Sequence, residues 1–207
     1  MTSRRRLSSG GPSSPADRIS LNIFREGKET ESGYLTNWQR LCRERVTVSV
    51  AAHGPTTPFE LVESAAMAKR FDLKEQRRGR GKAFDQYWCI FDVDEHPKML
   101  EALDMAKANA INIALSSPCL ELWFLIHFEN QTAYLDRNEA QRRSKVLLGC
   151  EKVLTPAALA LLVENYEKAK AHAQALEAKH VGDGTAQPWN PYSTVWRLVD
   201  EIRREAA

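Results

Sequence analysis

Apolar and polar positions along the chain form blocks that predict repeated strand–helix units. Four short apolar runs have the length and residue types of buried strands: residues 18–24, 46–53, 86–94 and 111–116. A pattern with helical spacing follows each run, and Thr57-Pro58 marks the start of one of these helices. This alternation predicts an α/β fold with a four-stranded, mainly parallel sheet flanked by helices.

The strand pattern ends after the fourth unit. The helix of that unit, in "SPCLELWFLIHFE", is apolar almost all round and is expected to be buried, with Ser117 as N-cap and Pro118 as its first residue. From Gln131 onward we predict three more helices, in "DRNEAQRRSKVLLGCEKVL", "TPAALALLVENYEKAKAHAQALEAKH" and "YSTVWRLVDEIRREA". We therefore expect an α/β domain (18–130) and a C-terminal helical extension (131–207) packed on the same core.

Composition narrows the class of protein without selecting one. Residues 1–17 are rich in Arg and Ser and lack an apolar run, so we interpret them as a disordered basic tail, with an organelle transit peptide as the weaker alternative. No apolar stretch approaches the length of about 20 residues that a membrane span needs. The four cysteines are scattered, which argues against disulfides and favours the cytoplasm. A net charge of +2 is too small to indicate a nucleic-acid binder by itself.

Acidic residues gather where the predicted strands end. Glu26 and Glu29 follow the first strand, Asp92 and Asp94 end the third, and Glu121 lies in the first turn of the helix after the fourth. The carboxyl ends of parallel strands share one edge of a sheet, so these side chains are expected to meet there. Carboxylate oxygens without thiolates suit Mg²⁺ or Mn²⁺. An acidic cluster at a strand end is more often a solvated turn, and only the shared edge argues against that alternative.

Four stretches of the sequence resemble the motifs of one protein family. "FREGKETESGYL" resembles its glutamate–glycine motif, "IFDVDEH" its D-x-D motif, "SSPCLELWFLIHF" its third block and "NPYSTVWRLVDEI" its C-terminal block. From about Ile19 to Ile202 the chain is thus similar to the RloB-like proteins, which include the abortive-infection protein AbiLii. These proteins resemble the Toprim superfamily of topoisomerases, bacterial primases and OLD-type nucleases, so the resemblance implies a Toprim-like fold. One departure is Ser117, which stands where Asn is commoner.

The resemblance also implies a chemistry and a partner. It assigns Glu26 to acid/base chemistry or metal binding, and Asp92 with Asp94 to holding Mg²⁺. The implied activity is a Mg²⁺- or Mn²⁺-dependent nuclease that cleaves RNA, tRNA or DNA in phage defence, beside an AAA-type ATPase. We count Glu121 with the metal ligands because an ionised carboxylate among apolar neighbours needs a partner.

Other polar residues are weaker candidates. The basic loop "KEQRRGRGK" (74–82), which leads into the strand that carries Asp92, can follow a phosphate backbone without reading bases and equally suits a solvated surface. Glu29 suits a helix N-terminus better than a metal site, and His127 suits the core better than a phosphate contact. Lys28 could neutralise a phosphate or pair with Glu31. The predicted nucleic-acid-binding residues are Lys28, Arg77, Arg78, Arg80 and Lys82.

Two other functions fit the same residues. A non-catalytic regulatory or binding subunit of an ATPase defence complex would keep the acids for structure alone, and a nucleotidyl transferase would use them as primases do. Loss of function on substitution of Asp92 and Asp94 would distinguish an enzyme from a binding subunit. RNA and DNA both stay open as substrates, as do one or two metal ions and a monomer or a homo-oligomer.

Overall fold

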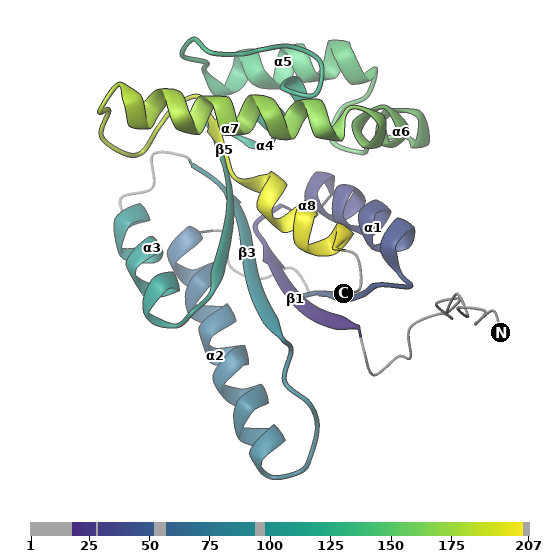
Figure 1. The fold of residues 1–207 in the computed structure, drawn as a ribbon, viewed down its shortest axis with the longest axis vertical. Helices are drawn as coiled ribbons and strands as arrows, with labels where there is room; N and C mark the ends of the chain where they lie inside the picture. Colours follow the sequence, from purple (N-terminus) through teal and green to yellow (C-terminus); the bar gives the residue numbers. More distant parts are fainter. Residues whose placement is uncertain (1–17, 28, 52–56, 94–97, 205–207) are drawn as a thin grey trace, which may run out of the picture.

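The centre of the molecule is a five-stranded sheet (Figure 1). The computed structural model describes residues 18–27, 29–51, 57–93 and 98–204. The strands are β1 (Ile19–Arg25), β2 (Val46–Val50), β3 (Gln86–Asp92), β4 (Asn112–Ser117) and β5 (Tyr192–Ser193). They lie in the order β2-β1-β3-β4-β5, with the first four parallel and β5 antiparallel to β4. The predicted α/β fold with a mainly parallel sheet is confirmed, whereas β5 was not predicted because two residues are too short to show alternation.

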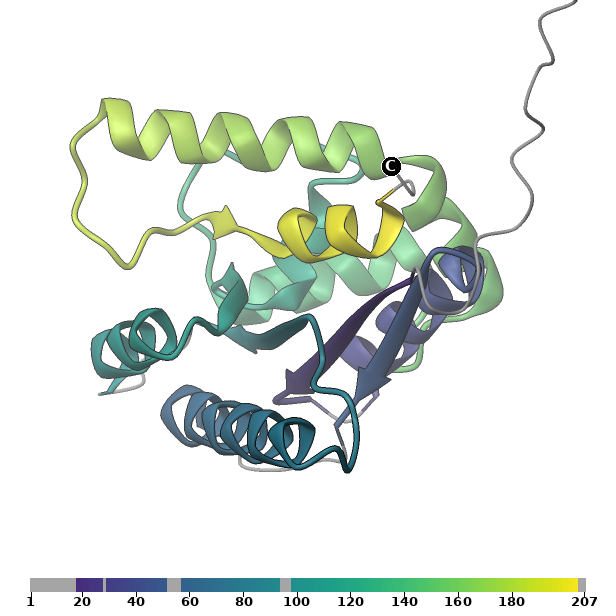
Figure 2. The same ribbon diagram turned by 60° about the horizontal axis from the view of Figure 1, so that its bottom comes forward.

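Helices cover both faces of this sheet. They are α1 (Thr30–Cys42), α2 (Pro58–Arg77), α3 (Met99–Ala108), α4 (Leu120–Leu125), α5 (Arg137–Leu148), α6 (Pro156–Glu164), α7 (Tyr166–Gly182) and α8 (Val195–Arg203). Because side chains alternate along a strand, Tyr87, Cys89 and Phe91 of β3 join the buried cluster under α2 and α3. Trp88 and Ile90 join the cluster under α1, α4 and α8. Figure 2 shows α7 stacked outside α8 on this second side.

All three predicted helices of the extension, and helix α4 before them, differ in their bounds. The first, expected over 136–154, ends as α5 at Leu148, where Gly149 takes a left-handed conformation. The third, expected from Tyr192, begins as α8 at Val195 because Tyr192 and Ser193 form β5. The long second helix of the extension is two helices, α6 and α7, which meet at Asn165, whose side-chain Nδ2 donates to the Leu161 carbonyl at 2.9 Å. Helix α4 has Cys119 as its N-cap without a side-chain cap, so the expected capping by Ser117 is wrong. Ser117 instead ends β4 and pairs with Tyr192 of β5. In the described part of the chain, no helix is long and apolar enough to cross a membrane.

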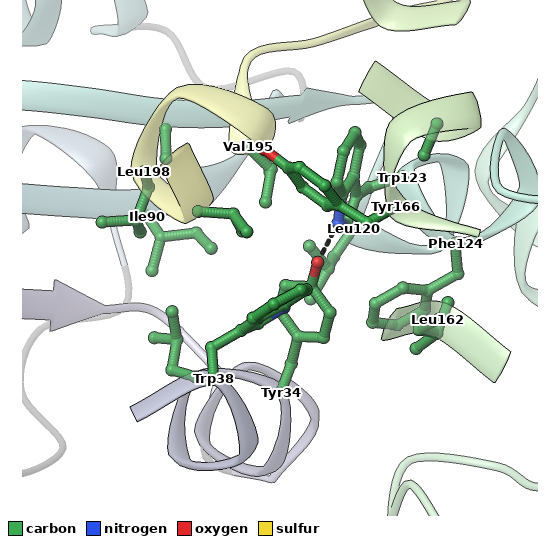
Figure 3. Close-up of a cluster of buried hydrophobic side chains, with 14 of the residues drawn as sticks. Tyr34, Trp38, Ile90, Leu120, Trp123, Phe124, Leu162, Tyr166, Val195 and Leu198 are labelled. Carbon is green, nitrogen blue, oxygen red and sulfur yellow. Dashed lines mark hydrogen bonds between the residues drawn. The ribbon is translucent and has the colours of Figure 1, made fainter. Parts of the chain in front are cut away.

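A buried aromatic cluster joins the sheet to the C-terminal helices (Figure 3). The indole Nε1 of Trp123 in α4 donates a hydrogen bond to the hydroxyl oxygen of Tyr34 in α1 at 2.8 Å. Both rings are fully buried, and Trp123 also makes an edge contact with Tyr166 of α7. One core therefore contains residues from 18–130 and from 131–207. The bond between Trp123 and Tyr34 also fixes α1 against α4, whose first turns carry Glu31 and Glu121.

Candidate metal and phosphate site

Adjacent strands bring two of the predicted acids to one edge of the sheet. The backbone N–H of Glu26, directly after β1, donates to the carbonyl of Ile90 in β3 at 3.3 Å. Asp92 is the last residue of β3. Side chains two positions apart along a strand lie on the same face of the sheet, so Asp92 shares the face of Trp88 and Ile90, which α1 and α4 cover. One carboxylate oxygen of Asp92 accepts a hydrogen bond from the N–H of Leu120 at 2.9 Å. Asp92 therefore ties the start of α4 to the sheet edge.

Glu31, in the first turn of α1, belongs to the same acidic group, although its place in the sequence suggested only a pair with Lys28. Burial raises the pKa of Glu31, and the nearby charge of Glu121 raises it further. A Cβ atom at Gly27 would overlap the Glu31 carboxylate, so the glycine of the motif leaves the space that this side chain occupies. The helical spacing of apolar residues in α1 could have indicated this position. Glu31 lies about one turn before the buried Tyr34 and therefore on the inward face of the helix.

The charges around Asp92 are concentrated and poorly solvated. The pKa of Asp92 is raised from 3.8 to about 8, mainly by burial and further by the carboxylates of Glu121, Glu31 and Glu26. Arg137 of α5 opposes this rise, since its guanidinium donates to Asp92 at 2.8 Å. The side chain of Asp92 is 13% exposed and that of Arg137 is 41% exposed. The structure therefore already places one cation, a guanidinium from the extension, against a largely buried carboxylate of the group.

Two adjoining hollows open at this edge. The acidic hollow has a volume of about 410 Å³, and the basic hollow beside it has about 280 Å³. Glu121, Gln141 and Lys152 line both, so the two hollows adjoin each other. The acidic hollow is lined by Gly27, Glu29, Thr30, Glu31, Asp92, Leu120, Glu121, Arg137, Gln141 and Lys152. The basic hollow is lined by Glu121, Gln141, Arg142, Ser144, Lys145, Cys150, Glu151 and Lys152.

The donor atoms at this edge fit a hard divalent cation. Among the described residues, no three Asp, Glu, His or Cys side chains already form a metal-coordinating group, and Asp94 lies outside those residues. The carboxylates that raise the pKa of Asp92 supply only oxygen ligands, as Mg²⁺ and Mn²⁺ prefer. A cation bound among them would relieve the repulsion that these charges exert on one another. Glu31, Asp92 and Glu121 line the acidic hollow and Glu26 does not, so a bound cation would have to draw these side chains together from their present positions.

The remaining predicted site residues are Glu29, His127, Asp94 and Lys28. Glu29 is exposed at the rim of the acidic hollow and is the N-cap residue of α1, although its side chain makes no capping hydrogen bond. His127 is fully buried, where its Nδ1 lies 2.7 Å from the Trp123 carbonyl oxygen and burial lowers its pKa to about 4. It lines neither hollow. Asp94 and Lys28 lie outside the described residues.

The predicted basic loop lies at the other end of the sheet. Arg77 ends α2, and the loop that follows enters β3 at its amino end, seven residues before the chain reaches the acidic edge at Asp92. Arg78 and Arg80 are exposed and pair with Glu75 at 2.9 and 3.8 Å. The loop therefore does not line the acidic hollow. The cations that do are residues of the extension, which sequence reasoning missed because their approach depends on contacts between distant segments.

Comparison with known proteins identifies the family of the chain. No curated protein and no solved structure matched the chain. The model of the family described as RloB-like protein matches residues 21–202, which include all of the described acids of the site. On that match, the chain belongs to the RloB-like family.

Proposed function

We propose that this chain is a Mg²⁺- or Mn²⁺-dependent nuclease that hydrolyses phosphodiester bonds of RNA, tRNA or DNA. The observation that carries the proposal is the meeting of Glu26, Glu31, Asp92 and Glu121 at one edge, where burial and repulsion raise the pKa of Asp92 to about 8. Strongly perturbed carboxylates beside a hollow are typical of sites that bind cations or move protons. Membership of the RloB-like family supports the proposal through the resemblance of that family to Toprim enzymes.

Each acid has a role in this proposal. Asp92, Glu31 and Glu121 would hold the metal, with Asp94 completing the D-x-D motif. A metal bound there would activate water and neutralise the charge that develops on the phosphate. Glu26 would accept the proton of the attacking water or donate one to the leaving oxygen.

Cleavage assays with matched variants test the proposal. Purified protein would be incubated with labelled RNA, tRNA and DNA in Mg²⁺ or Mn²⁺, with and without an AAA-type ATPase partner and ATP. We expect Glu26→Gln and Asp92→Asn to lower the cleavage rate by about 100-fold or more, as the loss of an acid/base group does. Glu101→Gln, on the exposed surface of α3, is the matched control and keeps the wild-type rate. The absence of metal-dependent cleavage of any substrate, with the partner active, would contradict the proposal.

The cellular setting is proposed on the resemblance alone. We propose that the chain acts in the cytoplasm in phage defence by abortive infection, together with an AAA-type ATPase. Co-expression of both proteins should reduce phage plating, and the protection should be lost with Asp92→Asn. Full protection without any ATPase would contradict the partnership.

The ion pair between Asp92 and Arg137 favours a second candidate function. A carboxylate that already has a guanidinium partner 2.8 Å away can serve structure without any metal. The chain would then be a non-catalytic regulatory or binding subunit of the ATPase complex. In that case Asp92→Asn would keep both phage protection and the binding of the ATPase, whereas the nuclease requires that protection is lost while binding is kept.

A further inference from the structure

The acidic hollow by itself repels the substrate that the proposed nuclease must bind. Among the described residues that line it, four are carboxylates and two are cations, Arg137 and Lys152. A phosphodiester carries a negative charge, so strand binding there needs positive charge that the acids do not supply. Nucleic-acid binding by proteins depends on such charge, because the cations release counterions from the phosphates.

The adjoining basic hollow has the opposite balance. Among its described lining residues, the carboxylates are Glu121 and Glu151 and the cations are Arg142, Lys145 and Lys152. Arg142 pairs with Glu139 at 2.7 Å, and Lys145 pairs with Glu151. These four side chains are 36–72% exposed, and exposed ion pairs contribute little, so phosphate groups can compete for the two cations.

Lys152 stands at the junction of the two hollows, and the fold holds it there. The hydroxyl of Thr30, in the first turn of α1, donates a hydrogen bond to the backbone carbonyl of Lys152 at 2.8 Å. Thr30 lies one residue before Glu31, so this bond clamps the loop after α5 to the turn that carries the glutamate–glycine motif. The lysine and the motif are 122 positions apart in the chain.

We propose that α5 and the loop after it form the track for the substrate backbone. In this arrangement, which depends on the proposed nuclease function, Arg137 and Lys152 bind the phosphate over the acids. Lys145, Arg142 and Lys152 bind the next phosphate along the strand in the basic hollow. Their contacts are to phosphates alone, so the track recognises a nucleic-acid strand without selecting its sequence.

Oligonucleotide binding as a function of salt tests the track. Fluorescence anisotropy would follow a labelled single-stranded 20-mer, with Ca²⁺ replacing Mn²⁺ to prevent turnover. For a single strand, log K falls as log[salt] rises, and each lost phosphate contact reduces the magnitude of that slope by about 0.7. Lys145→Gln/Lys152→Gln removes two cations and should therefore reduce the magnitude of the slope by about 1.4. Lys107→Gln, exposed on α3, is the matched control and keeps the wild-type slope. The double variant should also keep the rise in melting temperature on adding Mn²⁺, because neither lysine is a proposed metal ligand.

A second pair of variants tests the clamp. Thr30→Val removes the hydrogen bond to Lys152 and should lower the slope by less than the loss of the lysine itself, whereas Thr30→Ser keeps the hydroxyl and the wild-type slope. An unchanged slope in Lys145→Gln/Lys152→Gln, with salt-dependent binding by the wild type, would overturn the track. So would a drop seen only with Arg78→Gln/Arg80→Gln, which would move the track to the other end of the sheet. If the variants behave as expected but no cleavage occurs, the track stands and the nuclease fails; if the wild type binds no oligonucleotide, both fail.

Discussion

Replacing the buried carboxylate of Asp92 by an amide should make the metal-free protein more stable. The pKa of Asp92 is raised from 3.8 to about 8, so at neutral pH the unfolded chain ionises this carboxyl while the folded protein holds it mostly protonated, and folding must take up a proton. Asparagine keeps an oxygen to accept the N–H of Leu120 and loses the ion pair with Arg137. A shift of about four pKa units corresponds to at most about 5 kcal/mol, and with solvent relaxation we expect Asp92→Asn to gain about 2–4 kcal/mol at pH 7.5.

The gain should follow the pH dependence of that carboxylate. Well below pH 3.8 the carboxyl of Asp92 is neutral in both the folded and the unfolded state, so the free energies of unfolding of the variant and the wild type should approach each other. As the pH rises from 4 to 8, the unfolded state ionises first and the wild type loses stability relative to the variant. Above pH 8 the difference becomes constant.

Urea unfolding followed by tryptophan fluorescence measures this difference. The titrations would be run in EDTA at several pH values between 4 and 8.5, with Asp104→Asn on the exposed surface of α3 as the control, expected to stay within about 0.5 kcal/mol of the wild type. Excess Mn²⁺ should then offset most of this difference. At 100 times its Kd a ligand stabilises the folded state by about 2.7 kcal/mol, and the variant lacks a carboxylate to bind it. A variant that is less stable than the wild type in EDTA at pH 7.5, or a difference that does not change with pH, would refute the electrostatic argument.

Three further predictions concern the glycine of the motif and two buried hydrogen-bonding groups. Gly27→Ala should displace the Glu31 carboxylate and weaken Mn²⁺ binding measured by calorimetry. Gly33→Ala is the control, because its new Cβ meets no atom within 4 Å and should leave the affinity unchanged. Equal affinities of the two variants for Mn²⁺ would contradict the packing argument. Tyr34→Phe leaves the buried indole N–H of Trp123 without its acceptor and should lower the free energy of unfolding by about 1–3 kcal/mol in urea titrations, an effect that would be absent if water replaced the hydroxyl. Burial lowers the pKa of His127 to about 4, so the folded state resists protonation. The free energy of unfolding should therefore fall by about 1.4 kcal/mol per pH unit as the pH drops from 6.5 to 4. His127→Leu should remove this part of the pH dependence, and an unchanged pH dependence would assign it to other groups.

The sequence predicted the sheet well because its signals are local. Each parallel strand is a short apolar run, and the acids directly after such runs could be placed at the carboxyl edge by topology alone. Glu26 and Asp92 were found in this way. Helix α4 was harder, since Ser117 has the residue type of an N-cap but is already paired in the sheet with β5.

The partners of those acids could not be predicted, because contacts between distant segments decide them. Arg137 reaches Asp92 across 45 positions, and the carbonyl of Lys152 reaches Thr30 across 122. Nothing in the local pattern of α5, or of the loop after it that carries Lys152, distinguishes these cations from those of any solvated segment. The basic loop shows the converse, since its composition suggested a phosphate contact while the direction of β3 places it at the far end of the sheet.

The sequence by itself determined which residue types follow each strand, and therefore that carboxylates meet at one edge of a parallel sheet. The tertiary structure decided how deeply each carboxylate is buried and which group lies against it. It buries much of Glu31 and leaves Glu29 exposed, and it pairs Arg137 with Asp92. It also places Lys152 where both hollows meet its side chain. The physical reason is that strand direction and side-chain alternation are encoded within a few residues. The desolvation and the charge pairing that set the pKa of Asp92 arise only when helices far along the chain close over the edge of the sheet.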